Sequence, residues 1–431
     1  MRIVAFHDYA GPSIAIHSPG KIGFELGHYT SAGGDEFAPD VIPREVSRAW
    51  VPGARWNRED GWLTEGLPEY LAWRYLLETK PDAARVVVAT AMRDAGTEIR
   101  LLTLADIQSW WAHGQNVLDG ENREIEKRRA RQRGFMALRT LETVIDRERV
   151  DRALPDFIRR YGKGDASLKN FQIVCEEIAG RKLDWFFRYS FREAGIPEIE
   201  LRRLASETPG VAAGEIIVKG LPPEGSLRVE MTVRTAQGVV EHSVATRGEI
   251  TPFTVNIPAP ALGMTLDPDM RILRWTEAAA KSKAQSGILA GLPEPIQAKD
   301  LPAAIEIYRR ALAADPEDAS GRGQSLRERL GELEWAHDEW NAALDDLEAA
   351  INGHSISPFE TYLTRGKAYL YHGLVLLHER RPKEALEDAR AGMAMPAEVL
   401  TQIVLESPIE IHSRNTLEQR LQILINAATH Y

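Results

Sequence analysis

The spacing of apolar residues changes twice along this 431-residue chain, and these changes limit what it can fold into. From Pro43 to about residue 193 the apolar residues recur at helical spacing. Between residues 198 and 276 they alternate with polar residues in short runs separated by Pro and Gly, which predicts antiparallel strands. From residue 301 onward the spacing is helical again. We therefore expect a multidomain, mainly α-helical protein with a small antiparallel β-sandwich in its middle.

These changes in pattern also predict the domain boundaries, and a length of this size suggests about three domains. The predicted segments are a helical domain at 1–197, a β-sandwich at 198–276, a small-residue linker at 277–300 and a helical domain at 301–431. Within the first domain, residues 1–34 read as short strand-like pieces with turns. The clearest helices of this domain are expected over residues 65–77, 134–145, 151–161 and 168–179.

The last helical domain contains an irregular repeat of small and larger apolar residues. Ala304, Tyr308 and Ala311 stand at offsets 0, 4 and 7, and residues 343/347/350 and 385/389/392 repeat these offsets. Leu330-Gly331 lies 12 residues before the second set. The spacing resembles that of the two interlocking helices of a tetratricopeptide (TPR) unit, although these repeats begin 39 and 42 residues apart and not ~34. A helical-hairpin repeat is thus predicted, with a generic helical bundle as the alternative.

Composition excludes several classes of function. The net charge of -10 gives no general basis for binding nucleic acid or an anionic membrane. The single cysteine, Cys175, rules out an internal disulfide, and its place in a helical pattern predicts a buried structural thiol. No apolar run reaches the ~18 residues of a membrane span, and residues 1–8 do not form a signal peptide. A cytoplasmic protein is therefore the default expectation.

Two strings in the first helical region carry a family resemblance. Residues 44–50 read REVSRAW, and residues 62–72 read WLTEGLPEYLA. Together they resemble the signature of the aminopeptidase N family, His-Glu-x-x-His-x-x-Trp followed by Trp-Leu-x-Glu-Gly-Phe-x-x-Tyr. This family comprises gluzincin zinc peptidases with a thermolysin-like catalytic domain. The resemblance covers about residues 10–200, and the β-sandwich that follows matches the family's domain order. Further matching segments lie at 131–135, 151–162, 183–187 and 195–199.

The resemblance implies roles for four residues. In the family, the two histidines and the Glu of the second string bind zinc, and the Glu between the histidines is the general base. The histidine positions are Arg44 and Arg48 here, the general base maps to Glu45, and the third ligand maps to Glu65. A guanidinium has no lone pair to give a metal, and zinc prefers nitrogen or sulfur donors over two lone carboxylates. We therefore expect no cofactor at this place, with zinc retained through other ligands, such as His17 or His28, as the alternative.

Other family positions differ too. The tyrosine that stabilises the family's transition state corresponds to Arg131, and His17 falls where the family has the Glu that holds the substrate's amine. From Arg48 to Glu65 the chain advances 17 positions, against ~19 in the family. Family members also carry a β-rich domain ahead of this region, so the resemblance implies a truncated domain or an incomplete start. Some relatives are fused to membrane segments, but no residue here indicates a membrane contact.

Charge balance suggests what occupies the site without zinc. Buried carboxylates without a metal would leave uncompensated negative charge. We therefore predict that Arg48 or Arg44 pairs with Glu65. The alternative is that both arginines point to solvent. A pocket of Arg44, Arg48 and His17 would suit a carboxylate such as a peptide C-terminus, and a closed, self-paired cluster is the favoured alternative. The basic run at 126–133 is predicted to be a solvated helix face or loop.

The expected function is that of an inactive metallopeptidase homologue acting as a peptide- or protein-interaction module. The concave face of the TPR-like tail would be the binding surface for a peptide or a partner helix. The alternative is an active aminopeptidase N-like hydrolase in which Glu45 is the general base.

Overall fold

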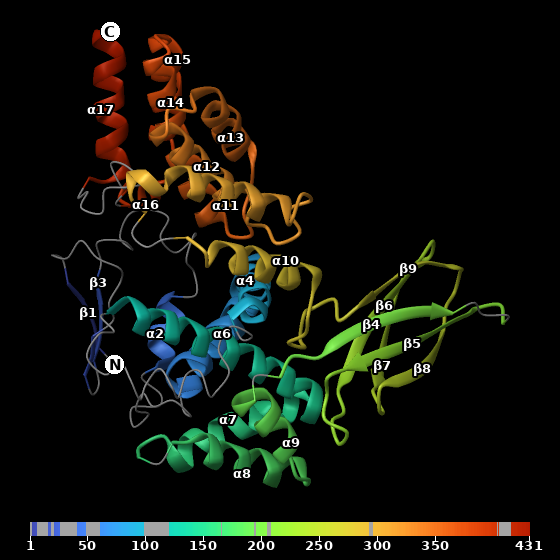
Figure 1. Cartoon of the computed structure of the whole chain (residues 1–431). Helices are drawn as coiled ribbons and strands as arrows, with labels where there is room; N and C mark the ends of the chain where they lie inside the picture. The colour runs from blue at the N-terminus through green and yellow to red at the C-terminus, as the bar shows by residue number, and fades with distance from the viewer. Residues whose placement is uncertain are drawn as a thin grey trace. The chain divides into compact units, whose positions relative to one another are not determined.

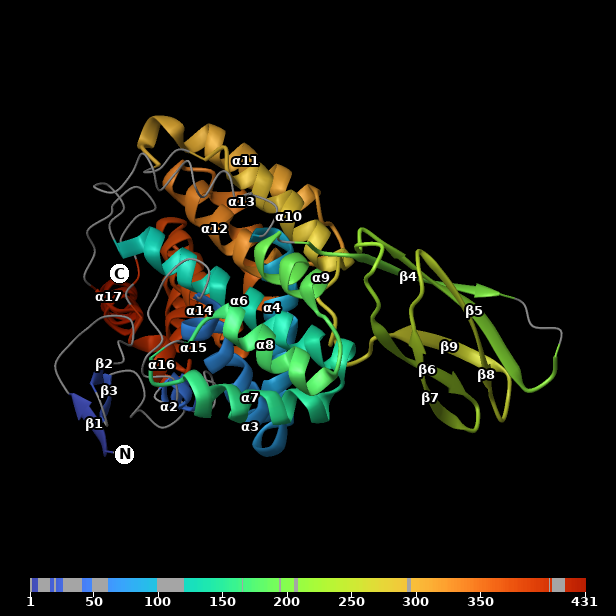
Figure 2. The same cartoon turned by 90° about the horizontal axis from the view of Figure 1, so that it is seen from below.

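The computed structural model describes two compact units of a mainly helical chain (Figures 1 and 2). One unit is Asp40–Ala279, and the other combines Met1–Pro39 with Ala280–Tyr431. In the described part of the chain, no helix has both the length and the apolar character needed to cross a membrane. The structure describes residues 2–6, 16–18, 21–25, 41–48, 61–98, 120–164, 166–193, 195–204, 208–292, 296–402, 404 and 415–431.

The unit Asp40–Ala279 begins with helices whose ends follow ordinary local signals. Ser167 caps α8 by accepting a hydrogen bond from the backbone N–H of Asn170, and Gly180 ends that helix in the left-handed region at φ 68°. The helix expected from residue 134 starts earlier, at Gly120. The helical elements are α2 (Val41–Arg48), the π-helical turn η2 (Trp62–Gly66), α3 (Leu67–Thr79), α4 (Pro81–Glu98), α6 (Gly120–Ile145), α7 (Arg147–Tyr161), α8 (Leu168–Ala179), α9 (Asp184–Phe187) and η3 (Arg188–Arg192).

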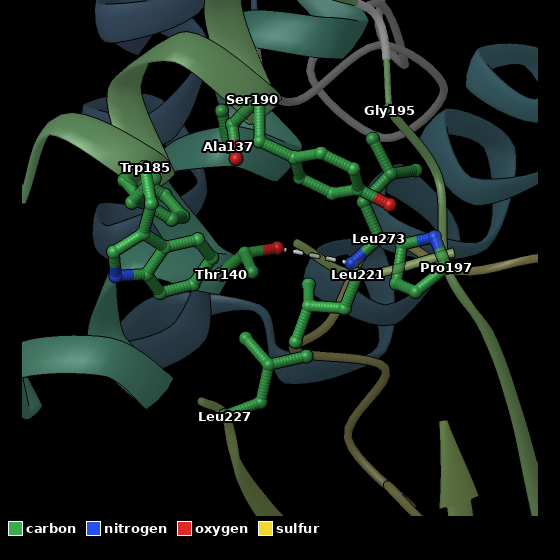
Figure 3. A pocket seen from close by; sticks show the side chains of 11 residues that line it. Ala137, Thr140, Trp185, Ser190, Gly195, Pro197, Leu221, Leu227 and Leu273 are labelled. Carbon is green, nitrogen blue, oxygen red and sulfur yellow. Dashed lines mark hydrogen bonds between the residues drawn. The ribbon is translucent and has the colours of Figure 1, made fainter. Parts of the chain in front are cut away.

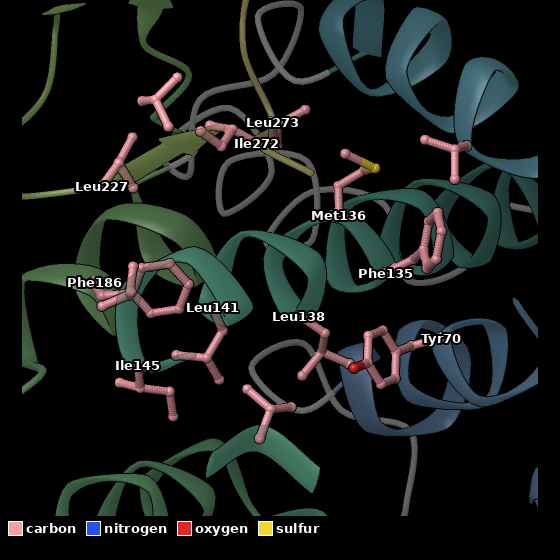
Figure 4. Packing of buried hydrophobic residues seen from close by; sticks show 14 of the residues in the cluster. Tyr70, Phe135, Met136, Leu138, Leu141, Ile145, Phe186, Leu227, Ile272 and Leu273 are labelled. Atoms are coloured by element: carbon pink, nitrogen blue, oxygen red, sulfur yellow. The ribbon is translucent and has the colours of Figure 1, made fainter. Parts of the chain in front are cut away.

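The crossing of η2 and α6 is set by two glycines. A Cβ atom on Gly66 would lie 2.5 Å from the Cα atom of Gly134, so only glycine lets the two backbones approach this closely. Buried side chains pack around the crossing, and Figure 4 shows Leu138 of α6 beside Tyr70 of α3. Cys175 of α8 is fully buried in the same core, as the sequence predicted.

Two three-stranded antiparallel sheets complete this unit and confirm the predicted strand region. Both sheets contribute alternate side chains to the hydrophobic core that the helices share, for example Ile216 from one and Met231 from the other. The hydroxyl of Thr140 on α6 accepts a hydrogen bond from the N–H of Leu273 at 3.0 Å, which ties the segment after the strands to this helix. The sheets are β4 (Glu198–Leu204), β5 (Val211–Lys219) and β8 (Ile250–Asn256) in the order β4-β5-β8, and β7 (Gly238–Ala245), β6 (Arg228–Thr235) and β9 (Ala261–Leu266) in the order β7-β6-β9.

The other unit combines a small sheet with the helices of the second half. In the sheet, β1 (Arg2–Phe6) pairs in parallel with β3 (Lys21–Glu25), and β2 (Ile16–Ser18) pairs antiparallel with β3. Much of the segment expected to be a linker forms helix α10 (Glu277–Leu289), because its alanines favour a helix. The remaining elements are η4 (Ala298–Asp300), α11 (Leu301–Ala313), α12 (Gly323–Ala336), α13 (Trp340–Asn352), α14 (Pro358–His378), α15 (Pro382–Met393), α16 (Ala397–Leu400) and α17 (Leu417–His430).

Helices α12 and α13 form a hairpin, and so do α14 and α15, each joined by three residues. The predicted contact between small and larger apolar residues is present in the first hairpin, where a Cβ atom on Gly331 would meet the Leu347 side chain at 2.5 Å. Gly373 occupies the corresponding place in α14, and its Cβ would lie 3.3 Å from the carbonyl oxygen of Ala385. The small residues at these offsets therefore serve close helix packing.

Candidate functional site

Two ion pairs join α2 to the segment formed by η2 and α3. Arg44 and Arg48 lie one turn apart on one face of α2, and Glu65 and Glu69 are likewise four residues apart. Arg48 Nη2 donates to Glu65 Oε2 at 2.5 Å, and Arg44 Nη1 donates to Glu69 Oε2 at 3.0 Å. The Arg48–Glu65 pair is the one that charge balance predicted. Glu69 was missed, although it stands within the quoted second string, because it was not among the positions to which the resemblance assigned a role.

A third guanidinium reaches the same carboxylates from α6. Arg131 Nη2 lies 3.6 Å from Glu65 Oε2, and Arg131 Nε lies 3.9 Å from Glu69 Oε2. The residue at the position of the family's tyrosine therefore does lie at this site. We refer to Arg44, Arg48, Arg131, Glu65 and Glu69 as the guanidinium cluster.

The prediction that the basic run is solvated was wrong for its last three residues. Arg131 keeps only 27% of its side-chain surface exposed, and Gln132 is buried. Arg133 Nε donates to the carbonyl oxygen of Ser190 at 2.8 Å. The physical reason is the crossing at Gly134, where the middle of α6 packs closely against η2 and η3. The side chains of residues 126–129 lie outside those described.

Burial and charge shape the electrostatics of the guanidinium cluster. Burial, together with the neighbouring charge of Arg44, lowers the pKa of Arg131. An arginine in such surroundings still carries its charge at neutral pH. The side chains of Glu65 and Glu69 are 5% and 8% exposed, whereas that of Arg48 is 22% exposed. The carboxylates thus lie deeper than the guanidiniums of Arg48 and Arg131.

The described residues do not fit a zinc ion at this place. Both positions that would need an imidazole hold guanidiniums, which cannot ligate a metal, and Glu65 and Glu69 accept from these guanidiniums. Across the part of the chain that the structure describes, no three or more His, Cys, Asp or Glu side chains gather in a way that would hold a metal. The side chains of Glu45 and His17, and all of His28, lie outside the described residues.

Two cavities elsewhere in this unit do not offer a better site. The apolar pocket in Figure 3, between α6, η3 and the segments flanking the strands, holds about 10 Å³, which is room for a single water at most. A larger open cleft of about 400 Å³ is lined by charges of both signs. Arg271 at its wall is bound to Glu142 at 3.0 Å and also to Glu230, so these three charges are paired with one another.

Comparisons with known proteins show a distant likeness in fold. No family model matches the sequence, and no curated protein matches it. Among solved structures, the fold is similar to the crystal structure of Legionella pneumophila aminopeptidase A in complex with aspartic acid, with a TM-score of 0.48 and 14% sequence identity. The similarity covers 93% of this chain and 52% of that one, so the chain spans about half the length of that protein.

Proposed function

We propose that this chain is a metal-free, non-catalytic homologue of aminopeptidase N-like zinc peptidases that acts as a peptide- or protein-interaction module. The observation that carries the proposal is the pairing of Arg44 with Glu69 and of Arg48 with Glu65. In this proposal, the guanidinium groups balance the charge of the buried carboxylates, and the Lewis acid on which zinc-dependent peptide hydrolysis relies is missing.

The domain assignment belongs to the same proposal. We assign residues 1–197 to a thermolysin-like peptidase domain, 198–276 to a β-sandwich, 277–300 to a linker and 301–431 to TPR-like repeats. The shared core of the two antiparallel sheets supports the sandwich, and the fit of Gly331 against Leu347 supports the repeats. The TPR-like helices would present a surface to a peptide or partner helix, and a cytoplasmic location stays a prediction.

Hydrolysis of aminoacyl-nitroanilides tests the proposal against the alternative of an active peptidase. The native chain, the chelator-treated chain and the variant Glu45→Gln are assayed side by side at equal concentration. We expect all three to match the rate of the uncatalysed reaction. Hydrolysis by the native chain that is lost both with chelator and in Glu45→Gln would establish Glu45 as a general base and overturn the proposal.

A further inference from the structure

A fully buried carboxyl group lies where helix α11 meets the hairpin of α12 and α13. Glu334, near the end of α12, has no exposed surface, and its Oε1 atom accepts a hydrogen bond from Arg309 Nη2 of α11 at 2.7 Å. Its other oxygen, Oε2, is buried and makes no hydrogen bond in the described part of the chain. A buried carboxylate oxygen without a donor is costly when the group is ionised, because water no longer solvates the charge. Burial therefore favours a neutral, protonated Glu334.

The arginine that approaches Glu334 is shared with a second carboxylate. The same Nη2 atom of Arg309 also donates to Glu339 Oε2 at 2.6 Å, and 43% of the Arg309 side chain is exposed. A single, partly solvated nitrogen thus serves two acidic side chains. His337 Nδ1 lies 3.0 Å from Glu339 Oε1, so a proton on this imidazole would add positive charge to the same group of side chains.

Charges on the neighbouring helices favour the protonated carboxyl further. Asp346 of α13 lies close enough to disfavour a negative charge on Glu334, and its own partner is Arg327 of α12 at 2.6 Å. Among the described side chains of this group, three carboxyls, Glu334, Glu339 and Asp346, face two guanidiniums. Burial raises the pKa of Glu334 to about 7, although the hydrogen bond from Arg309 opposes the shift.

Apolar side chains complete the contact between α11 and α12. Ala304 and Ile305 of α11 belong to one buried cluster with Leu330 and Leu333 of α12. Glu334 directly follows Leu333 in the sequence, so its charge acts at the edge of this apolar contact. A change in that charge would therefore alter how firmly α11 covers α12.

We propose that Glu334 and Arg309 form a pH-sensitive contact, which holds α11 against α12 while Glu334 keeps its proton and loosens when the proton is lost. Opening this contact exposes Glu334 to water, where a glutamate releases its proton near pH 4.5. Between about pH 4.5 and 7 the closed contact therefore binds a proton that the open one has released, and the contact weakens as the pH rises through this range. Loosening would uncover Leu330 and Leu333, so the pH would control the exposure of an apolar surface.

Hydrogen–deuterium exchange of the full chain, read by mass spectrometry on peptides from α11, tests this contact between pH 6 and 8. The rates are corrected for the intrinsic pH dependence of amide exchange. With the pKa of Glu334 at about 7, the protection of α11 should fall about tenfold over this range. Glu334→Gln, a neutral side chain of the same shape, should keep that protection constant. Glu348→Gln, at an exposed position on α13, is the matched control and should behave as the native chain does.

Equal protection of α11 at pH 6 and 8 in the native chain would overturn the proposal without requiring any variant to fold. A folded Glu334→Gln variant, checked by circular dichroism, that keeps the native pH dependence would also overturn it. Glu328, another buried carboxyl of α12, lies beside Lys367 of α14, so Glu328→Gln should leave the pH dependence of α11 in place. Loss of that dependence in Glu328→Gln alone would assign the proton to Glu328 and refute the role of Glu334.

Discussion

Replacing Glu65 by glutamine should destabilise the unit Asp40–Ala279 more than any other single removal of charge in the guanidinium cluster. Glu65 is the carboxylate that Arg48 approaches at 2.5 Å and Arg131 at 3.6 Å, and only 5% of its side chain is exposed. The variant Glu65→Gln keeps the shape of the side chain. It removes the negative charge beneath two guanidiniums.

The expected magnitude follows from burial. Removing one partner of a buried ion pair costs about 3–5 kcal/mol, and we take the lower end, about 3 kcal/mol, because Arg48 and Arg131 keep partial contact with solvent. Arg48→Gln should cost less, about 1–2 kcal/mol, because Arg131 still lies beside the carboxylate of Glu65. A larger loss in the free energy of unfolding for Glu65→Gln than for Arg48→Gln would indicate that the Glu65 carboxylate interacts with two arginines.

Urea unfolding followed by tryptophan fluorescence measures both losses, since Trp62, Trp73 and Trp185 are buried in this unit. With a slope of about 3 kcal/mol per molar urea, Glu65→Gln should lower the midpoint by about 1 M. Glu78→Gln, at an exposed position of α3, is the matched control and should shift it little. A Glu65→Gln midpoint indistinguishable from that of Glu78→Gln would refute the reasoning.

Three further predictions concern packing, pH and reactivity. Gly66→Ala should lower the free energy of unfolding by about 1–3 kcal/mol because its Cβ would collide with the backbone of Gly134, whereas Gly164→Ala, with nothing within 4 Å, should be neutral in the same urea experiment. Burial raises the pKa of Glu328 on α12 to about 7 despite the adjacent Lys367. Between about pH 4.5 and 7 the folded state therefore keeps a proton that the unfolded state has released. The free energy of unfolding should fall as the pH rises across this range. In Glu328→Gln, thermal unfolding should show a smaller fall in Tm over this range, and an unchanged fall would contradict the assignment. Burial also raises the pKa of the Cys175 thiol, so a disulfide reagent at pH 8 should label the native chain far more slowly than the urea-unfolded chain, and equal rates would contradict a buried thiol.

Helices and strands could be predicted where local sequence patterns mark them. Helix α8 was predicted with both of its ends because Ser167 and Gly180 supply local start and stop signals. The strands between residues 198 and 276 were predicted because alternation of apolar residues is also a local property. The start of α6 was placed too late, since residues 120–133 are strongly charged and lack an apolar period.

The composition of the candidate site was only partly predictable. Arg44, Arg48 and Glu65 followed from a resemblance between short strings. The partnership of Arg44 with Glu69 and the approach of Arg131 depend on how three separate segments cross in space. The crossing itself is fixed by the contact between Gly66 and Gly134, which are 68 residues apart in the sequence and show no shared pattern. Long-range contacts of this kind determine which charges meet.

The metal content of the purified chain tests the central claim most directly. The chain is incubated with excess zinc at neutral pH and dialysed, and the zinc per chain is then measured by mass spectrometry. The double variant Arg44→His, Arg48→His is the matched comparison, since it places two imidazole donors one turn apart beside Glu65 and should retain more zinc than the native chain. We predict that the native chain retains far less than one zinc per chain. One zinc per native chain that survives dialysis would contradict the claim that guanidiniums have taken the place of the metal.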